Sequence, residues 1–150
     1  YGSELPFDGA MFSAGVEQPI AFSHRLHVTD KQIDCRYCHT AVDRSPHAGL
    51  PPALTCLGCH EHIIPQHAEI ATLKGFWLRG EDVPWVRVYH NPDHVAFPHF
   101  RHVGKGVECR ECHGDLEQVD RLRKVTFYMG FCLECHAARN APRTCTACHQ

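Results

Sequence analysis

The chain has 150 residues, enough for one domain or two very small ones. Its 15 basic and 17 acidic residues give a formal charge of −2, which excludes the basic face expected of a nucleic-acid-binding protein. No apolar run approaches the roughly 18 residues that cross a bilayer, so no membrane-spanning helix is predicted.

The first predicted element is an extended arm over residues 1–19. This segment contains Gly, Pro and small residues and follows neither a helical nor a strand period. Because the chain starts at Tyr1 and not at Met, we expect that an export signal or an anchor has been removed from its N-terminus.

The first half of an internal repeat occupies residues 20–60. It consists of a Phe-x-His-x-x-His segment followed by two Cys-x-x-Cys-His motifs. These parts begin, in chain order, at Phe22, Cys35 and Cys56. Between the two motifs, His47 lies in a loop where Gly and Pro can hold the backbone close to a cofactor.

Residues 61–96 connect this half to the next. Within them, residues 68–78 are predicted to form a helix and residues 84–89 a short strand. Trp77 and Trp85 are expected to pack against porphyrin faces, because large aromatic side chains are usually buried, and a place in an interface is the alternative.

The second half of the repeat occupies residues 97–136, and residues 137–150 add one further motif. The parts of this region begin at Phe97, Cys109, Cys132 and Cys145. The charge-rich residues 116–131 include Arg121, Arg123 and Lys124. We expect either a solvated helix face here or cations that pair with carboxylates of a cofactor.

The five Cys-x-x-Cys-His motifs predict five covalently attached c-type haems. Two thiols at this spacing add across the two vinyl groups of one porphyrin, and the next residue, histidine, becomes the proximal ligand of the iron. The attached cysteines would be Cys35, Cys38, Cys56, Cys59, Cys109, Cys112, Cys132, Cys135, Cys145 and Cys148. The proximal ligands would be His39, His60, His113, His136 and His149.

Zinc sites and disulfides are the alternative uses of ten cysteines. Zinc ribbons contain Cys-x-x-Cys pairs but do not need histidine after every second cysteine. With 14 histidines in 150 residues, five such coincidences have a chance probability of roughly 10⁻⁵. A disulfide framework is disfavoured because the motifs leave no cysteine over to pair.

Nine histidines lie outside the motifs, and five six-coordinate irons need five of them as distal ligands. The His-x-x-His spacing places two imidazoles on one face of a helical turn, where they can reach two different irons. The repeat thereby supplies four distal ligands, His24, His27, His99 and His102. For the fifth we favour His47, and His90 and then His94 are the alternatives.

The expected fold is mostly irregular with short α-helices. A chain with only about 30 residues per haem must use the stacked porphyrins for most of its core. Short helices would carry the motifs, with long loops and little sheet between them.

Three segments carry a resemblance to a known family. They are Gln18-Pro-Ile-Ala-Phe-Ser-His24 with Gln32-Ile-Asp-Cys35, Ser45-Pro-His47-Ala-Gly-Leu-Pro51, and Pro84-Trp-Val-Arg-Val-Tyr-His90-Asn-Pro-Asp-His94-Val-Ala-Phe-Pro-His99. The Phe-x-His-x-x-His segment before a motif resembles the class III multihaem cytochromes. Together the segments resemble the pentahaem subunit of alternative complex III and the related multihaem subunit of menaquinone reductase complexes, over residues 18–149.

That resemblance implies electron transfer in a periplasmic respiratory or photosynthetic chain, by a subunit of a membrane-bound, quinol-linked oxidoreductase. The implied partners are iron–sulfur or quinone-reactive subunits and small c-type cytochromes. Membrane contact would run through these partners or a removed anchor, at the periplasm or the outer face of the cytoplasmic membrane. The alternatives are a free-standing periplasmic carrier and a haem-based reductase of a small oxyanion. With spare histidines for every iron, no open coordination position, and hence no catalytic residue, is expected.

Overall fold

A computed structural model describes residues 15–149 of the chain. Most of the expected N-terminal arm, residues 1–14, therefore lies outside the described residues. At the end of that arm, the Val16 amide donates to the Leu122 carbonyl at 2.8 Å, so residues 15–19 begin beside the second half of the chain.

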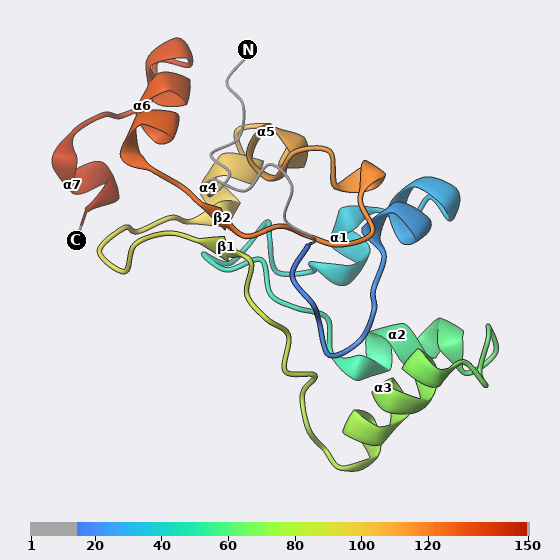
Figure 1. The fold of residues 1–150 in the computed structure, drawn as a ribbon. Coiled ribbons are helices and arrows are strands. Elements are labelled where there is room, and N and C mark those ends of the chain that lie inside the picture. Colours follow the sequence, from blue (N-terminus) through green and yellow to red (C-terminus); the bar gives the residue numbers. More distant parts are fainter. Residues whose placement is uncertain (1–14, 150) are drawn as a thin grey trace.

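Short helices separated by irregular segments make up most of the described part of the chain, as expected (Figure 1). The α-helices are α1 (Cys35–Cys38), α2 (Ala53–His60), α3 (Ala68–Leu78), α4 (His99–Val103), α5 (Cys109–His113), α6 (Met129–Ala138) and α7 (Cys145–Cys148). A π-helix, η1 (Arg25–Asp30), and a 3₁₀-helix, η2 (Leu116–Gln118), complete the helical elements. The sheet consists of two short parallel strands, β1 (Tyr89–His90) and β2 (Val125–Thr126).

The helix predicted over residues 68–78 is confirmed as α3, which lies beside α2 in Figure 1. Burial of one side of each helix explains this packing. A small apolar cluster joins the two helices to segments on either side, and it consists of Ile20, Leu57, Leu73 and Val83. Trp85 packs against this apolar cluster, whereas Trp77 on α3 is 45% exposed.

Two local predictions need correction. Of the strand expected over residues 84–89, only Tyr89 lies in a strand. The charge-rich residues 116–131 form no continuous helix, because their centre pairs with β1 instead. The Val125 amide donates to the Val88 carbonyl at 2.7 Å and the Val125 side chain is fully buried, so tertiary packing decides the conformation here.

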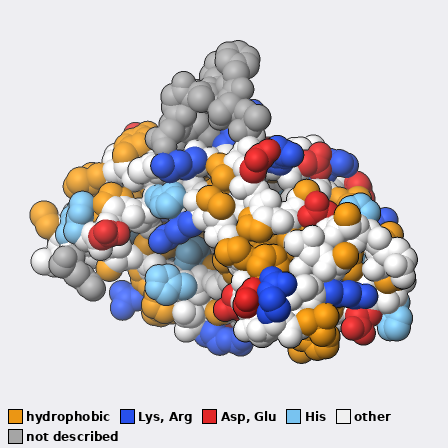
Figure 2. Space-filling view, turned by 60° about the horizontal axis from the view of Figure 1, so that its bottom comes forward, with side chains coloured by type: hydrophobic (Ala, Val, Ile, Leu, Met, Phe, Trp, Pro, Cys, Tyr) orange, Lys and Arg blue, Asp and Glu red, His pale blue; other side chains and the backbone are white. Residues whose placement is uncertain are grey.

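The polypeptide core is small for a chain of this length. The buried apolar residues of the described part are Ile20, Leu57, Ile70, Leu73, Val83, Val88 and Val125. Large apolar side chains meanwhile remain exposed, including Leu54 and Leu78 at 63% and 76%. Side chains of both charges lie among them on the face drawn in Figure 2. Much apolar surface is thus left for something other than protein to cover.

No helix within residues 15–149 is long and apolar enough to span a bilayer.

The two halves of the repeat support each other through backbone and side-chain hydrogen bonds. In one direction, the Arg25 amide donates to the Val119 carbonyl at 3.1 Å, and the Arg25 side chain pairs with Asp120 at 3.2 Å. In the other direction, the His99 amide donates to the Pro46 carbonyl at 3.2 Å. Each His-x-x-His segment is therefore fixed by the loop that follows an attachment helix of the other half.

Candidate haem-binding site

Each Cys-x-x-Cys-His motif lies on a helix, which explains how its two thiols come to share one face. Cysteines three positions apart lie on the same side of a helical turn. α1, α5 and α7 begin at the first cysteine of their motifs, whereas α2 and α6 begin three residues before it. The Asp34 side chain caps α1 by accepting from the Arg36 amide at 2.8 Å, and a capping box of Glu108 and Glu111 starts α5.

Neighbouring thiols show how the first three motifs are ordered in space. Burial raises the pKa of the Cys56 thiol, and the nearby Cys38 raises it further. Burial and then the adjacent Cys109 raise the pKa of Cys35. The second motif therefore lies beside the first, and the first lies beside the third.

The same contacts continue to the C-terminus. Burial and then Cys135 raise the pKa of the Cys112 thiol to about 11, which places the third motif beside the fourth. Burial and then Cys148 raise the pKa of Cys132, which places the fourth motif beside the fifth. The five motifs form one row, with α2 and α7 at its two ends, far apart in Figure 1.

The motif histidines are faced by histidines from elsewhere in the chain. The ring centres of His27 and His60 are 6.0 Å apart. Those of His99 and His113 are 6.3 Å apart, and those of His102 and His136 are 6.1 Å apart. His99 and His102 of one His-x-x-His segment thus face two different motifs, and His27 of the other segment faces the second motif.

These separations fit an iron held between two imidazoles. A metal–nitrogen bond of about 2 Å on each side, with each nitrogen about 1 Å from its ring centre, sets the ring centres roughly 6 Å apart. Within residues 15–149, no three or more His, Cys, Asp or Glu side chains converge as a metal cluster. The donors are therefore arranged as opposed pairs, unlike the four-ligand tetrahedra of structural zinc sites.

His24 completes the first site. The pKa of His24 is lowered to about 4, mainly by burial and then by the nearby His39 and His27. His24 therefore lies near His39, the histidine of the first motif. Burial likewise lowers the pKa of His113 to about 4, with His99 as the strongest neighbour. Both imidazoles are thereby kept neutral, the form that binds a metal.

Backbone carbonyls fix the orientation of the paired imidazoles. A carbonyl can only accept, so the nitrogen that faces it must carry the proton, which leaves the other nitrogen free for a metal. Nδ1 is the donor in every bond of this kind among the paired histidines. The bonds are His27–Ser23 O at 2.8 Å, His39–Gly49 O at 2.8 Å, His60–Ile63 O at 3.1 Å, His99–Pro46 O at 2.8 Å, His102–Pro98 O at 3.0 Å and His136–Pro142 O at 2.6 Å.

The imidazole that faces His149 belongs to His94. The two rings are stacked with centres 5.2 Å apart, because Val95 forms an antiparallel bridge with His149 and the Ala96 amide donates to the Cys148 carbonyl at 2.8 Å. The favoured fifth ligand, His47, is exposed, and the ring stacked on His149 is that of His94. The Nε2 of His90 is bonded to the Arg87 carbonyl at 2.9 Å, so that nitrogen is occupied.

The loop around His47 supplies carbonyl oxygens to histidines of two sites. Gly49 accepts from His39, and Pro46 accepts from His99. Gly49 has a φ of +76°, a left-handed conformation that glycine adopts without strain. The Gly and Pro of this loop thus orient ligands of neighbouring sites.

Two comparisons with known proteins agree with this geometry. A family model described as cytochrome c7 and related cytochrome c matches residues 95–150, which hold the third, fourth and fifth motifs. The menaquinone reductase, multihaem cytochrome c subunit, of Nitratidesulfovibrio vulgaris is 30% identical over 162 aligned positions, covering 89% of this chain and 77% of the relative. The chain belongs to the multihaem cytochrome c family. Members of this family bind c-type haem covalently through Cys-x-x-Cys-His, and so does this cytochrome.

A large cavity of the cytochrome has the lining that such a cofactor needs. It measures about 1550 Å³, more than the roughly 300–1,000 Å³ typical of a single ligand pocket. Its wall includes four histidines and five cysteines: His94, His102, His136, His149, Cys112, Cys132, Cys135, Cys145 and Cys148. The residues of the fourth and fifth sites thus surround one continuous space.

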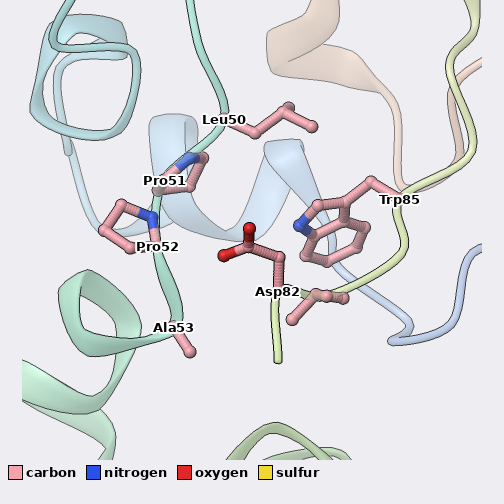
Figure 3. Close-up of a pocket in the computed structure, with 7 residues that line it drawn as sticks. Leu50, Pro51, Pro52, Ala53, Asp82 and Trp85 are labelled. Atoms are coloured by element: carbon pink, nitrogen blue, oxygen red, sulfur yellow. The ribbon is translucent and has the colours of Figure 1, made fainter. Parts of the chain in front are cut away.

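A second pocket of the cytochrome is different in kind. It measures about 200 Å³ and lies before α2, where Asp82 and Trp85 face Pro51 and Pro52 across the space (Figure 3). No cysteine or histidine lines it, and it is smaller than a typical cofactor pocket. It is therefore not a haem site.

Tyr89 is a site residue that sequence reasoning missed. Its hydroxyl donates to the His113 carbonyl at 3.0 Å, and its ring meets the His113 ring edge-on with centres 4.5 Å apart. Burial raises the pKa of Tyr89 to about 12, so the hydroxyl remains a donor. β1 thereby holds the proximal histidine of the third site in place.

Proposed function

We propose that the chain is a pentahaem cytochrome that transfers electrons along its row of five sites, with every iron held by two histidines. The observation that carries this proposal is that each of the five motif histidines lies close to a second histidine. The proposed pairs are His39 with His24, His60 with His27, His113 with His99, His136 with His102 and His149 with His94. Four of these distal ligands are those expected from the repeat, and His94 takes the place of His47.

A bound c-type haem supplies reversible one-electron chemistry at its iron. The paired histidines would fill both axial positions, so no position remains for a substrate such as an oxyanion. The polypeptide's part is to orient imidazoles through backbone carbonyls, as it does for His27, His39, His60, His99, His102 and His136. This arrangement favours electron transfer over substrate reduction.

The domain organisation proposed for this function has two dihaem halves, residues 20–60 and 97–136, joined by residues 61–96. The fifth site, in residues 137–150, extends the row at one end. The relative from N. vulgaris is a subunit of a menaquinone reductase, so we propose iron–sulfur, quinone-reactive or small c-type cytochrome partners for this chain, at the periplasm. Co-purification with such subunits separates this role from that of a free-standing carrier.

The haem count is tested by mass spectrometry of the denatured holoprotein. Five covalent haem adducts per chain are expected, because the five motifs use all ten cysteines. The ferric protein should at the same time be entirely low-spin, since every iron would have two histidine ligands. Fewer than five adducts, or a high-spin component in the wild-type protein, would contradict the proposal.

Docking to a partner is expected to depend on salt. The polypeptide charge is −2, and five haems with ionised propionates would make the holoprotein about −7 when oxidised and about −12 when reduced. A negative surface attracts a cytochrome with a basic face, although Arg121, Arg123 and Lys124 offset it locally. The bimolecular rate of electron transfer should fall roughly tenfold or more from low to high ionic strength. A flat dependence would exclude electrostatic docking.

The fifth site, at the end of the row, is the candidate contact for that partner. Replacing Cys145 and Cys148 with alanine should lower the rate to the soluble cytochrome. Thr146→Ala, in the same motif but without a covalent bond to haem, is the matched control and should leave the rate unchanged. An unchanged rate in the double cysteine variant would move the contact elsewhere.

A further inference from the structure

The first and third sites are neighbours in the row and occupy equivalent positions in the two halves of the repeat. Phe22 and His24 meet edge-on with ring centres 4.9 Å apart and an interplanar angle of 88°. Phe97 and His99 do the same at 4.9 Å and 89°. The aromatic ring beside each distal histidine is therefore closely matched between the two sites.

One hydrogen bond separates these two distal histidines. The Nδ1 of His99 donates to the Pro46 carbonyl at 2.8 Å. The Nδ1 of His24 is buried and has no hydrogen-bond partner in the structure. The cause lies in the loops that the halves exchange. Pro46 O accepts from both the amide and the ring of His99, whereas the matching carbonyl, Val119 O, accepts from the amide of Arg25, one residue beyond His24.

The remaining pair of distal histidines shows no such difference. The Nδ1 of His27 donates to the Ser23 carbonyl at 2.8 Å, and that of His102 donates to the Pro98 carbonyl at 3.0 Å. Both acceptors lie four residues earlier in the same segment, so they do not depend on the other half. The repeat contains two pairs of equivalent distal histidines, His24 with His99 and His27 with His102. Only in the first pair do the two Nδ1 atoms differ in their hydrogen bonding.

A hydrogen bond from Nδ1–H makes an imidazole a stronger electron donor through its other nitrogen. A stronger donor stabilises the ferric state more than the ferrous state, because the ferric iron carries the higher charge. Loss of that bond therefore raises the reduction potential of the iron that the imidazole binds.

We infer that the chain itself makes the haems of its first and third sites unequal: the haem held by His24 and His39 has a higher reduction potential than the haem held by His99 and His113. This inference rests on the proposed bis-histidine ligation. Because the ring of His24 lacks this hydrogen bond, an electron that reaches the first and third sites would reside preferentially on the haem of the first site.

The hydrogen bonds are tested first in the reduced, diamagnetic wild-type holoprotein by ¹H–¹⁵N NMR of the ligand rings. The Nδ1 proton of His24 should resonate upfield of that of His99, since it lacks an acceptor. The protons of His27 and His102 provide the internal control and should have similar shifts. Equal shifts for His24 and His99 would overturn the inference without any variant having to fold.

The potentials are then compared through His24→Met and His99→Met, each followed by an EPR-monitored redox titration. Methionine keeps the iron six-coordinate but removes one component from the bis-histidine population. The component missing in His24→Met should titrate at the higher potential in the wild type. Coincident or reversed midpoints would overturn the inference alone. If neither variant removes a bis-histidine component, the proposed ligands are themselves wrong, and the inference falls with them.

Discussion

Replacing His94 with alanine is expected to convert one haem in five from low-spin to high-spin. His94 faces His149 with ring centres 5.2 Å apart, held there by the bridge between Val95 and His149. Removing its imidazole leaves the iron of the C-terminal site with one axial histidine, and such an iron is high-spin. Low-temperature EPR of the ferric protein would show the new high-spin signal at about one fifth of the total haem.

His47→Ala is the matched control for this experiment. His47 is exposed and lies in the loop that supplies the carbonyls of Pro46 and Gly49 to neighbouring ligands. A change of its side chain leaves those carbonyls in place, so all five haems should stay low-spin. A high-spin haem in His47→Ala together with none in His94→Ala would restore His47 as the fifth ligand.

Removal of the haems is expected to abolish cooperative folding. The described part of the chain buries few apolar side chains, and its large cavity is lined by residues of the fourth and fifth sites. Ordering the backbone costs about 1–2 kcal/mol for each residue, and this small core cannot offset that cost. A variant with all ten cysteines replaced by alanine should show no cooperative thermal transition by circular dichroism.

A variant that lacks only Cys145 and Cys148 is the control for that result. Its missing site lies at one end of the row, and the apolar cluster between α2 and α3 is elsewhere. We expect it to unfold cooperatively, at a lower temperature than the wild type. A compact ten-cysteine variant with a sharp transition would show that the polypeptide alone is enough to specify the fold.

Local patterns in the sequence were enough to predict the attachment helices and to single out four histidines, His24, His27, His99 and His102, that lie near motif histidines in the structure. The Cys-x-x-Cys-His spacing has only one use that explains all ten cysteines, and the His-x-x-His spacing requires both imidazoles to lie on one face of a turn. Helix α3 was also predictable, because residues 68–78, which precede Gly80, form a continuous stretch without proline.

The features that were missed depend on contacts between distant segments. His90 and His94 differ little in sequence context, and the bridge from Val95 to His149 decides which of them faces the last motif. The extended conformation around Val125 likewise follows from its pairing with Val88, more than thirty residues earlier. No pattern near the Pro46 carbonyl indicates that it will serve His99 in the other half.

The exchange of loops between the two halves means that neither half contains all of its own support. Pro46 supports His99, while Val119 and Asp120 support the segment around His24. The carbonyls that orient His27 and His102 lie within their own segments. A fragment with only one half would keep those carbonyls and lose the contacts from the other half, so we expect the two halves to reach their native structure together and neither to do so alone.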